Sequence, residues 1–397
     1  MTVEIKNAFL SGEINAIPSK SYAHRIAICN FLAGKTPSAC CDGFSSNDIL
    51  VTEDCLKRLV KKETLLDCGE SGSTLRFMLP LCAAIGGTFT FIGHGKLMQR
   101  PNEELFSVFN ANGVETVKSD TITINGKLSA GKYQIRGDIS SQYISGLLMA
   151  LPILNGDSEI VLTTPLVSAP YVEITLEVLN AFGVEILRTS SGFYVKGNQT
   201  FYGNVLPEGD WSNMAFFLCA GAINGDICVK GLNIDSVQGD KYILDILRLA
   251  GALVQVENGT VRVEKSNLKP FVFDAENCPD LVPISAVLAS YADGKSVIKN
   301  IQRLKIKESD RVESTIAMLK GFGVRAESDG VNLAVYGGSV SCGSADAFND
   351  HRLVMSTAVL ALGADGVSSI SGAKAVNKSY PTFFKDYEKV GGKISEL

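Results

Sequence analysis

One succession of elements recurs along this chain, and it constrains the fold more than any other feature. An apolar helical segment with a small or acidic opening residue ends near glycine, and an expected strand, a second helix and a strand hairpin follow. Because the spacing is regular, we predict six copies of one α/β repeat. The first helices open near Lys20, Ser73, Ser141, Ser212, Asp280 and Asp350, at intervals of 53, 68, 71, 68 and 70 residues.

The second helix of the repeat has its own regular signature. Apolar residues at i, i+3, i+4 and i+7, followed by a glycine stop, appear in YVEITLEVLNAFGVEI, YILDILRLAGALVQV and RVESTIAMLKGFGVRA. A hairpin signal comes after each of these helices. In VQVENGTVRVE the pair Asn258-Gly259 is typical of a two-residue hairpin turn.

The two ends of the chain complete this organisation. After FFKDYEKVGGKISEL no room remains for the closing strand of the sixth copy, while TVEIKNAFLSGEINAI at the N-terminus indicates two strands without a partner of their own. We therefore expect both N-terminal strands to complete the sixth copy. The chain then crosses twice between two lobes of three copies, residues 18–206 and residues 1–17 with 207–397, and two crossovers suggest a hinge.

Composition bounds the class of protein. With 397 residues and 46% apolar content the chain can bury a large core, and its length favours two domains. The start MTVEIKNAFL carries charge early, and no apolar run approaches the roughly 20 residues of a membrane span. We expect a cytoplasmic protein with neither signal peptide nor membrane anchor.

The ten cysteines indicate a reduced protein rather than a disulfide framework. Most lie in apolar runs such as RIAICNFLAG and AFFLCAGAI, where a free cysteine packs as a small core residue. No C-x-x-C pair occurs, and the three histidines, His24, His94 and His351, lie far apart in the sequence. The sequence therefore predicts no metal, and because no phosphate-loop or dinucleotide motif occurs in its proper context, no cofactor either.

Charge is distributed unevenly. A net charge of −5 argues against a nucleic-acid partner, which needs a broad basic surface. The helix openings nevertheless carry capping Ser, Asp and Asn residues, and helix N-termini attract anions. Basic side chains at repeat edges could be solvated surface, but their recurrence favours a small ligand, or two, with several negative charges. These basic residues are Lys20, Arg25, Arg76, Arg100, Lys307, Arg311, Arg352 and Lys378.

Two carboxylates stand out near these cations. Glu308 follows Lys307 in LKIKESDR and precedes Arg311, which is compatible with a charged helix surface or with an acid held among cations for proton transfer. Asp280 opens an apolar helix, so it is either an N-cap or a second such acid. The pattern leaves both alternatives open.

Several stretches resemble motifs of one enzyme family, the EPSP synthases (3-phosphoshikimate 1-carboxyvinyltransferases). They are PSKSYAHR, SAPY followed by VEITLEVLNAFGV, KIKESDR, and NDHR with KSYPTFF, and the resemblance runs along the full chain. It implies an α/β, two-lobed enolpyruvyl transferase fold in which each lobe holds three β-α-β-α-β-β units. It also implies a shikimate-pathway enzyme of aromatic amino acid and chorismate biosynthesis that closes on its substrates as a monomer.

The resemblance further implies which residues bind the two substrates. Each substrate carries a phosphate and a carboxylate, which would account for the gathered positive charge. Those implied for shikimate 3-phosphate are Lys20, Ser21, Arg25, Ser140, Ser141, Gln142, Ser168, Tyr171, Asp280 and Lys307. Those implied for phosphoenolpyruvate are Lys20, Gly72, Arg100, Gln142, Arg311, Arg352 and Lys378.

The implied reaction assigns roles to three residues. The 5-hydroxyl of the shikimate ring attacks C2 of phosphoenolpyruvate while C3 takes a proton, and the tetrahedral adduct then loses phosphate. Such a step needs a base, an acid and cations around the leaving group. Asp280 is the implied base and Glu308 the implied acid, with Lys20 assisting. Because elimination reverses the proton transfers, we treat the two carboxylates as one unit.

The sequence departs from the family pattern at three positions. Glu70 and Ser73 in DCGESGSTLRF stand where the family often has asparagine and threonine, and Arg303 stands where it often has asparagine. A carboxylate beside an anion site weakens anion binding unless it pairs with a cation or turns away. The roles of Glu70 and Arg303 therefore stay open at this stage.

Two alternative functions are compatible with the repeats. The sister enolpyruvyl transferase that acts on UDP-N-acetylglucosamine carries a reactive cysteine on a loop of the second copy, but GHGKLMQRPNEE has none, and SSQY favours a sugar-like acid phosphate. A non-catalytic repeat clamp for a polyanion would explain the repeats without the two carboxylates. The net negative charge opposes the clamp.

Overall fold

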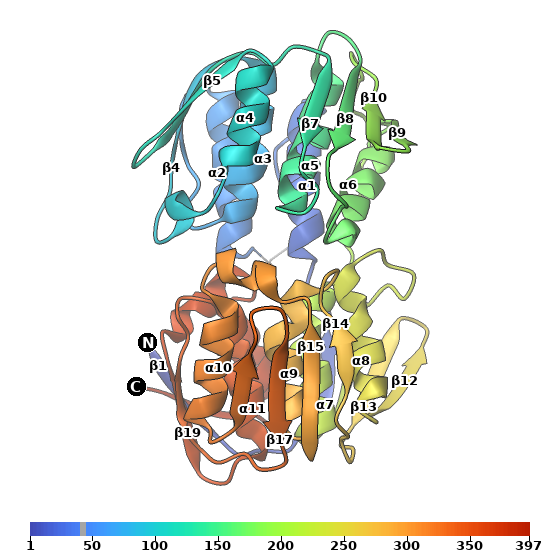
Figure 1. Ribbon diagram of the computed structural model, residues 1–397. Coiled ribbons are helices and arrows are strands. Elements are labelled where there is room, and N and C mark those ends of the chain that lie inside the picture. The colour runs from blue at the N-terminus through green and yellow to red at the C-terminus, as the bar shows by residue number, and fades with distance from the viewer. Residues whose placement is uncertain (40–44) are drawn as a thin grey trace. The chain divides into compact units, whose positions relative to one another are not determined.

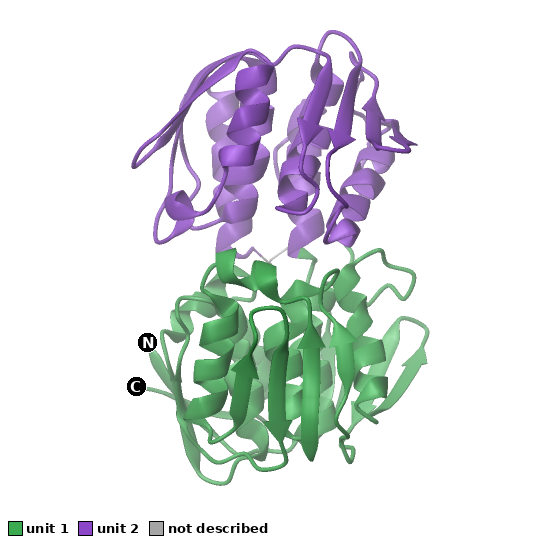
Figure 2. Cartoon of the chain, viewed as in Figure 1, with its two compact units in different colours: residues 1–19, 208–397 green, residues 20–207 purple. Residues whose placement is uncertain are grey.

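The computed structural model describes residues 1–39 and 45–397 and divides into two compact units (Figures 1 and 2). Unit 1 comprises residues 1–19 and 208–397, and unit 2 comprises residues 20–207. The chain thus leaves unit 1 after Ser19 and returns at Glu208. That the two lobes fold and move as separate domains, within the boundaries expected from the sequence, stays a prediction.

Unit 2 contains two four-stranded sheets, ordered β3-β4-β6-β5 and β7-β8-β10-β9. In each sheet the first two strands are parallel and the remaining pairs are antiparallel. The strands are β3 (Leu65–Asp67), β4 (Gly87–Ile92), β5 (Val114–Lys118), β6 (Ile122–Gly126), β7 (Lys132–Ile135), β8 (Ser158–Leu162), β9 (Ile186–Thr189) and β10 (Gly192–Val195). The helices are α1 (Lys20–Leu32), α2 (Asn47–Val60), α3 (Gly72–Ile85), α4 (Glu103–Ala111), α5 (Ser141–Ala150) and α6 (Ala169–Ala181), with 3-10 turns η1 (Leu97–Gln99) and η2 (Leu151–Ile153).

Unit 1 contains three four-stranded sheets, ordered β12-β13-β11-β2, β14-β15-β17-β16 and β18-β19-β1-β20. The strands are β1 (Thr2–Lys6), β2 (Leu10–Asn15), β11 (Gly225–Lys230), β12 (Leu253–Glu257), β13 (Thr260–Glu264), β14 (Val272–Asp274), β15 (Gly294–Lys299), β16 (Arg325–Ser328), β17 (Leu333–Gly337), β18 (Ser344–Asp346), β19 (Val367–Ser371) and β20 (Lys393–Glu396). The helices are α7 (Trp211–Asn224), α8 (Ile243–Leu249), α9 (Val282–Ser290), α10 (Arg311–Gly321), α11 (His351–Leu360) and α12 (Phe383–Lys389). The 3-10 turns are η3 (Gly239–Tyr242), η4 (Pro279–Leu281), η5 (Gln302–Ile306), η6 (Ala361–Gly363) and η7 (Ala373–Lys378).

The first helix of each repeat lies in the interior of its unit. Helix α7 is buried over almost its whole length, and α9 and α11 are buried throughout. Such all-round apolar helices cannot lie on a surface, so the sheets and second helices cover them. Helix α3 packs on α5 in unit 2, and α9 packs on α7 and α11 in unit 1. Buried polar side chains such as Arg25, Ser285 and Ser356 nevertheless lie within these helices.

The N-terminal strands correct one prediction. Strand β1 lies antiparallel between β19 and β20 and supplies the fourth strand of the sixth copy, as expected. Strand β20 forms where the sequence analysis left no room for a strand. The expectation that β2 also joins the sixth copy is wrong, because β2 runs parallel to β11 in the fourth. Leu10 and Ile14 of β2 are buried there, as alternate residues of a half-covered strand are.

The first repeat differs from the other five. Helices α1 and α2 follow each other here, and the described residues between 20 and 61 include no strand. The interval between helix openings is also shortest in this repeat, 53 residues against 68 to 71. A two-stranded hairpin takes on the order of 10–15 residues, so the shortfall accounts for its absence. The other five repeats each carry a four-stranded sheet.

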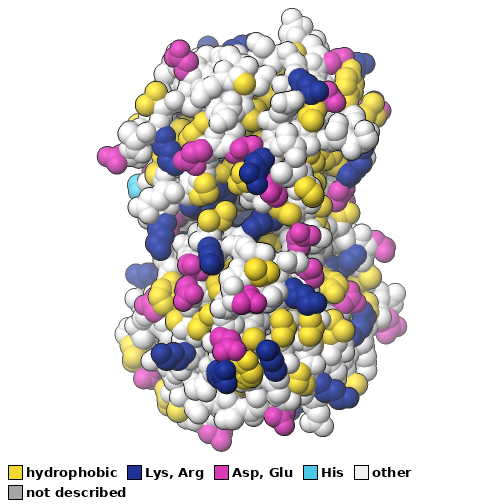
Figure 3. Space-filling model, in the orientation of Figure 1, with side chains coloured by type: hydrophobic (Ala, Val, Ile, Leu, Met, Phe, Trp, Pro, Cys, Tyr) yellow, Lys and Arg dark blue, Asp and Glu magenta, His cyan; other side chains and the backbone are white. Residues whose placement is uncertain are grey.

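Surface and cysteine properties follow the composition. On the face drawn in Figure 3, Lys and Arg side chains are interspersed with Asp and Glu. Among the described cysteines no disulfide occurs, and six of the eight are buried, as predicted for core thiols, whereas Cys228 is half-buried and Cys342 is exposed. Cys40 and Cys41 lie outside the described residues. None of the helices described is long and apolar enough to cross a membrane.

Candidate active site

Arg25 of α1 ties three helices of unit 2, α1, α5 and α6, together. Its Nε donates to Thr175 Oγ1 at 2.7 Å, its Nη1 to the Ser21 carbonyl at 2.6 Å, and its Nη2 to the Tyr171 carbonyl at 2.8 Å and to Ser145 Oγ at 3.3 Å. All four acceptors are uncharged, and burial lowers the pKa of Arg25 to about 10. One of its five N–H groups remains for a ligand. Arg25 therefore contributes enclosed positive charge and a single donor, not a bidentate contact.

Gln142, in the first turn of α5, is held in one orientation. Its Oε1 accepts from Arg76 Nη1 at 2.8 Å, and its Nε2 donates to Ser73 Oγ at 2.8 Å. Arg76 is itself fixed by Asn102 Oδ1 at 3.3 Å and by the Pro101 carbonyl at 3.1 Å. Because an arginine only donates, the amide oxygen points to Arg76, and the second N–H of the amide is directed elsewhere. Gln142 is thus set to donate to an anion.

Gly72 and Arg100 lie in close contact at the start of α3. A Cβ atom added at Gly72 would stand 2.3 Å from Arg100 Nη1, so the guanidinium would have to move away. Ser71 caps the helix by accepting from the Thr74 N–H at 3.2 Å. The absence of a side chain at Gly72 therefore lets a guanidinium lie against a helix N-terminus, and both attract anions.

Lys20, the first residue of α1, has a carboxylate partner that the sequence analysis missed. Its Nζ lies 2.7 Å from Oδ2 of Asp48, which stands in the first turn of α2. Both side chains are partly buried, with exposed fractions of 17% and 15%. The one sequence signal for Asp48 is its place at a helix opening, in SSNDIL.

The serines expected to bind phosphate lie at two helix starts of unit 2. Ser140 caps α5 by accepting from the Gln142 N–H at 3.3 Å, and Ser141 is the first residue of that helix. Ser168 precedes α6 with a left-handed backbone at φ 51°. For a residue with a side chain this conformation is costly, and such positions concentrate at functional sites.

In unit 1, Arg311 stands among three carboxylates. Its Nε lies 2.7 Å from Asp350 Oδ2, its Nη1 2.7 Å from Asp280 Oδ1, and its Nη2 2.6 Å from Glu308 Oε2. The side chain is only 2% exposed. Burial disfavours its charge, but Asp350, Glu308 and Asp280 together raise the pKa of Arg311 well above its ordinary value. The positive charge of Arg311 is therefore permanent, and the neighbouring carboxylates already neutralise it.

Asp280 is shared by three cations. Besides Arg311, its Oδ2 accepts from Arg352 Nη2 at 2.8 Å, and its Oδ1 lies 3.5 Å from Lys307 Nζ. Burial lowers the pKa of Lys307, Arg311 acts in the same direction, and Asp280 opposes them. Asp280 lies in η4, and the N-cap of α9 is Leu281, so the interpretation of Asp280 as a helix cap is wrong. Its carboxylate serves the cluster of charges.

Two further aspartates of unit 1 belong to this cluster. Asp350 is fully buried, caps α11 by accepting from the Arg352 N–H at 2.9 Å, and holds Arg311. The motif NDHR contains it, but the sequence analysis used it only as a helix start. Asp240 is buried, and burial followed by the charge of Asp280 raises its pKa to about 7, although Arg352 opposes the shift. No motif in the sequence pointed to Asp240.

Three remaining residues complete the inventory. Lys378, at the end of η7, donates from Nζ to the Asn349 carbonyl at 2.6 Å, one residue before Asp350. The Glu70 carboxylate lies against Gly95, where an added Cβ would stand 3.1 Å from it. Arg303 lies in η5 and lowers the pKa of Lys307 by its charge.

The arrangement has a definite chemical capacity. In unit 1, Asp280, Glu308, Lys307, Arg311 and Arg352 form one connected set of ion pairs, as the interpretation of an acid held among cations predicted. Carboxylates so placed can exchange protons with a bound hydroxyl or carbon. Unit 2 supplies helix N-termini, guanidinium groups and an oriented amide. No group of His, Cys, Asp and Glu suited to a metal ion occurs within the residues described.

The fold is that of the enolpyruvyl transferases. Solved structures of this class include the EPSP synthase of Acinetobacter baumannii, with a TM-score of 0.80 and 21% identity over 100% of both chains. They also include the enolpyruvyl transferase NikO of Streptomyces tendae, with a TM-score of 0.79 and 17% identity over 100% of this chain and 98% of that one. At these identities the likeness concerns the fold alone.

Sequence comparison narrows the class to one family. The family model described as EPSP synthase (3-phosphoshikimate 1-carboxyvinyltransferase) matches residues 59–387. The 3-phosphoshikimate 1-carboxyvinyltransferase of Clostridium novyi is 37% identical, and that of Clostridium acetobutylicum 38% identical, each over 99% of this chain and 98% of the relative. The chain belongs to the EPSP synthase family.

Proposed function

We propose that this chain is a 3-phosphoshikimate 1-carboxyvinyltransferase of the shikimate pathway. It transfers the enolpyruvyl group of phosphoenolpyruvate to the 5-hydroxyl of shikimate 3-phosphate and releases phosphate. Family membership along the whole chain supports the reaction class. The observation that supports the chemistry best is the pair Asp280 and Glu308, both within 2.7 Å of the same guanidinium.

Shikimate 3-phosphate is assigned chiefly to unit 2. The helix starts at Ser140 and Ser168 offer hydroxyl and backbone donors to its phosphate, and Gln142 offers an oriented N–H. Arg25 adds charge and one donor behind Ser21 and Tyr171. On this proposal the remaining contacts come from Lys20, Ser141, Asp280 and Lys307.

Phosphoenolpyruvate is assigned to cations of both units. Arg100 and the N-terminus of α3 at Gly72 suit one anionic group, together with Lys20 and Gln142. Arg311 and Arg352 are engaged by Asp280 and its neighbours, so an anionic substrate group has to take over one of these contacts. Replacing one anion by another leaves each cation neutralised. Lys378 supplies a further positive charge.

The proton transfers are assigned to the two carboxylates. Asp280 accepts the proton of the 5-hydroxyl while the hydroxyl oxygen bonds to C2 of phosphoenolpyruvate. Glu308 delivers a proton to C3, and Lys20 neutralises charge on the phosphate. In the second step a proton leaves the methyl carbon as the C–O bond to phosphate breaks, so the roles reverse and the pair acts as one unit. We also propose that the enzyme works as a cytoplasmic monomer and becomes more compact on binding, which small-angle scattering with shikimate 3-phosphate would reveal.

Phosphate release tests the proposed function. Wild-type protein with phosphoenolpyruvate and shikimate 3-phosphate should release inorganic phosphate, and Lys20→Met should lose about 10²-fold or more of the rate. The control Lys57→Met changes an exposed lysine of α2 that pairs with Glu53, and it should retain the full rate. Phosphate release with UDP-N-acetylglucosamine in place of shikimate 3-phosphate would instead support the sister transferase.

A further inference from the structure

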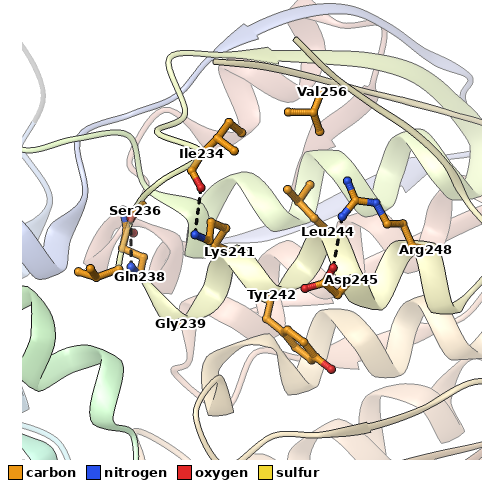
Figure 4. Close-up of a pocket in the computed structure, with 11 residues that line it drawn as sticks. Ile234, Ser236, Gln238, Gly239, Lys241, Tyr242, Leu244, Asp245, Arg248 and Val256 are labelled. Atoms are coloured by element: carbon orange, nitrogen blue, oxygen red, sulfur yellow. Dashed lines mark hydrogen bonds and ion pairs between the residues drawn. The ribbon is translucent and has the colours of Figure 1, made fainter. Parts of the chain in front are cut away.

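A pocket of 440 Å³ lies in unit 1 among residues that the proposed chemistry does not use. Its walls are the loop 234–239, helix α8 with the end of η3, and Val256 of β12 (Figure 4). Ile234, Leu244 and Val256 give part of the wall an apolar surface, and Tyr242 also lines the pocket. The volume lies in the range of sites for small organic molecules, and the lining combines apolar with polar and charged side chains.

The pocket carries one positive charge, that of Lys241, which has no ion-pair partner among the described residues. Lys241 Nζ donates to the Ile234 carbonyl at 2.9 Å, and the structure gives this ammonium no ion pair within the residues it describes. An ammonium has three donors, so two remain for a ligand. The other charged groups of the pocket, Arg248 and Asp245, pair with each other at 3.2 Å and cancel. The complement of this pocket is therefore an anionic group on an apolar body.

We propose that this pocket binds a small organic anion with an apolar body and that its occupancy changes the transferase activity. The binding claim depends on the pocket alone, and the claim about activity rests on the proposed function. The structure offers a route for such coupling through the segment 236–241, which forms one wall of the pocket.

This segment holds both places where the chain passes between the units. Gln238 Nε2 donates to the Gly209 carbonyl at 2.8 Å and to Glu208 Oε1 at 2.7 Å, and Ser236 Oγ donates to the same carboxylate. Ser19, the last residue of unit 1 before the chain leaves it, donates from Oγ to Gln238 Oε1 at 3.2 Å. A ligand that displaces Ser236 or Gln238 would therefore alter both crossover segments.

The same segment reaches the acidic cluster. Asp240 lies between the pocket residues Gly239 and Lys241, and its buried carboxyl interacts electrostatically with Asp280 and Arg352. Asp240 thus adjoins two residues of the pocket wall, and its carboxyl interacts with groups assigned to proton transfer and substrate binding. Occupancy of the pocket is expected to act on the crossover segments and on this cluster together.

The single tryptophan of the chain can report on the pocket through the lining residue Gln238. Trp211 donates from its backbone N–H to Gln238 Oε1 at 3.2 Å and from Nε1 to the Asn233 carbonyl at 3.0 Å. We would titrate the protein with 3-phenylpropionate, which has an apolar body and one carboxylate, and follow tryptophan fluorescence. Propionate lacks the body and 3-phenyl-1-propanol lacks the charge.

The proposal predicts a saturable fluorescence change with 3-phenylpropionate at concentrations about tenfold lower than with either control compound. Lys241→Met should raise the apparent Kd about tenfold, whereas Lys230→Met, an exposed lysine of β11 paired with Glu13, should leave it unchanged. Lys20→Met should also leave it unchanged, which separates this pocket from the active site. No saturable change, or equal Kd values for wild type and Lys241→Met, would overturn the proposal.

The effect of the ligand on activity is tested separately, by the kinetics of phosphate release. With 3-phenylpropionate saturating, kcat or KM for phosphate release should change at least about twofold in the wild type and not in Lys241→Met. Unchanged kinetics with the pocket occupied would overturn the claim about activity while leaving the proposed function intact. If the protein binds 3-phenylpropionate but never releases phosphate, the binding claim stands and the proposed function is refuted. The claim that the ligand changes the activity then fails as well.

Discussion

Two buried arginines, one in each unit, illustrate two ways of keeping a positive charge inside a protein. Arg25 of unit 2 is 3% exposed and is held by hydroxyl and carbonyl oxygens, so burial lowers its pKa to about 10. Arg311 of unit 1 is 1% exposed and is held by three carboxylates, which raise its pKa well above the ordinary value. Among the described residues the first charge has no counter-ion, and the second is neutralised in place.

The difference indicates separate tasks for the two sets of residues. An anion that approaches Arg25 meets uncompensated charge and displaces no carboxylate, which suits binding. An anion that approaches Arg311 has to compete with Asp280, Glu308 and Asp350, which suits a place where carboxylates are positioned for proton transfer. We therefore expect shikimate 3-phosphate to bind to the protein in the absence of phosphoenolpyruvate.

The largest effect is expected from Asp280→Asn. This change keeps the shape of the side chain and removes both the proposed base and the counter-ion shared by Arg311 and Arg352. The rate of phosphate release at saturating substrates should fall about 10²–10⁴-fold. Asp245→Asn, which removes an exposed partner of Arg248, serves as the control and should keep the wild-type rate. Full activity of Asp280→Asn would break the assignment of chemistry to unit 1.

Asp240→Asn tests whether the buried carboxyl of Asp240, next to the charged cluster of unit 1, has a raised pKa. Burial and Asp280 raise the pKa of Asp240 from 3.8 to about 7, so the folded protein holds this proton more tightly than the unfolded chain does. The resulting stability is fully present below about pH 4 and is lost as the pH rises to about 7. Asparagine does not titrate, so the variant should gain stability relative to wild type across that range, by up to about 4 kcal/mol.

Urea unfolding at about pH 5 and about pH 8 measures this difference. The gain of Asp240→Asn should be larger at the higher pH, whereas Asp245→Asn should show little change between the two. A difference between Asp240→Asn and wild type that stays constant with pH would contradict the raised pKa of this carboxyl.

A smaller effect is expected from Gly72→Ala in unit 2. Its Cβ would displace the Arg100 guanidinium, which lies 2.3 Å from that position. KM for phosphoenolpyruvate should rise about tenfold with a lesser change in kcat. Gly72→Ala and Arg100→Met act on the same contact. The double variant should therefore bind phosphoenolpyruvate no more weakly than Arg100→Met alone. Additive losses would show that Gly72 acts independently of Arg100.

Local patterns were sufficient to predict the repeats but not their long-range partners. The first helices begin within two residues of the expected openings, because caps such as Asp210 and Asp350 and the glycine stops are local signals. Strands β1 and β2 share one alternating pattern, and nothing in it states which sheet edge each strand meets. The short first interval was visible in the sequence, but only the structure relates it to a repeat whose described residues form no strand.

The same limit applies to the site. Charged residues at the repeat edges were identified because their types and spacing recur, and the structure brings five of those in unit 1 into contact. The sequence did not indicate which partner each charged side chain would pair with. Asp48 beside Lys20 and Asp350 beside Arg311 are pairs between distant segments, and the burial that raises the pKa of Asp240 exists only in the fold.

Calorimetric titration of shikimate 3-phosphate without phosphoenolpyruvate tests the central contrast most directly. We would compare Arg25→Lys with Arg311→Lys, which keep the charge but not the guanidinium geometry. Arg25→Lys should weaken binding at least about tenfold, while Arg311→Lys should leave Kd within about threefold of wild type. Equal losses in the two variants, or a greater loss in Arg311→Lys, would contradict the assignment of this substrate chiefly to the uncompensated charge of unit 2.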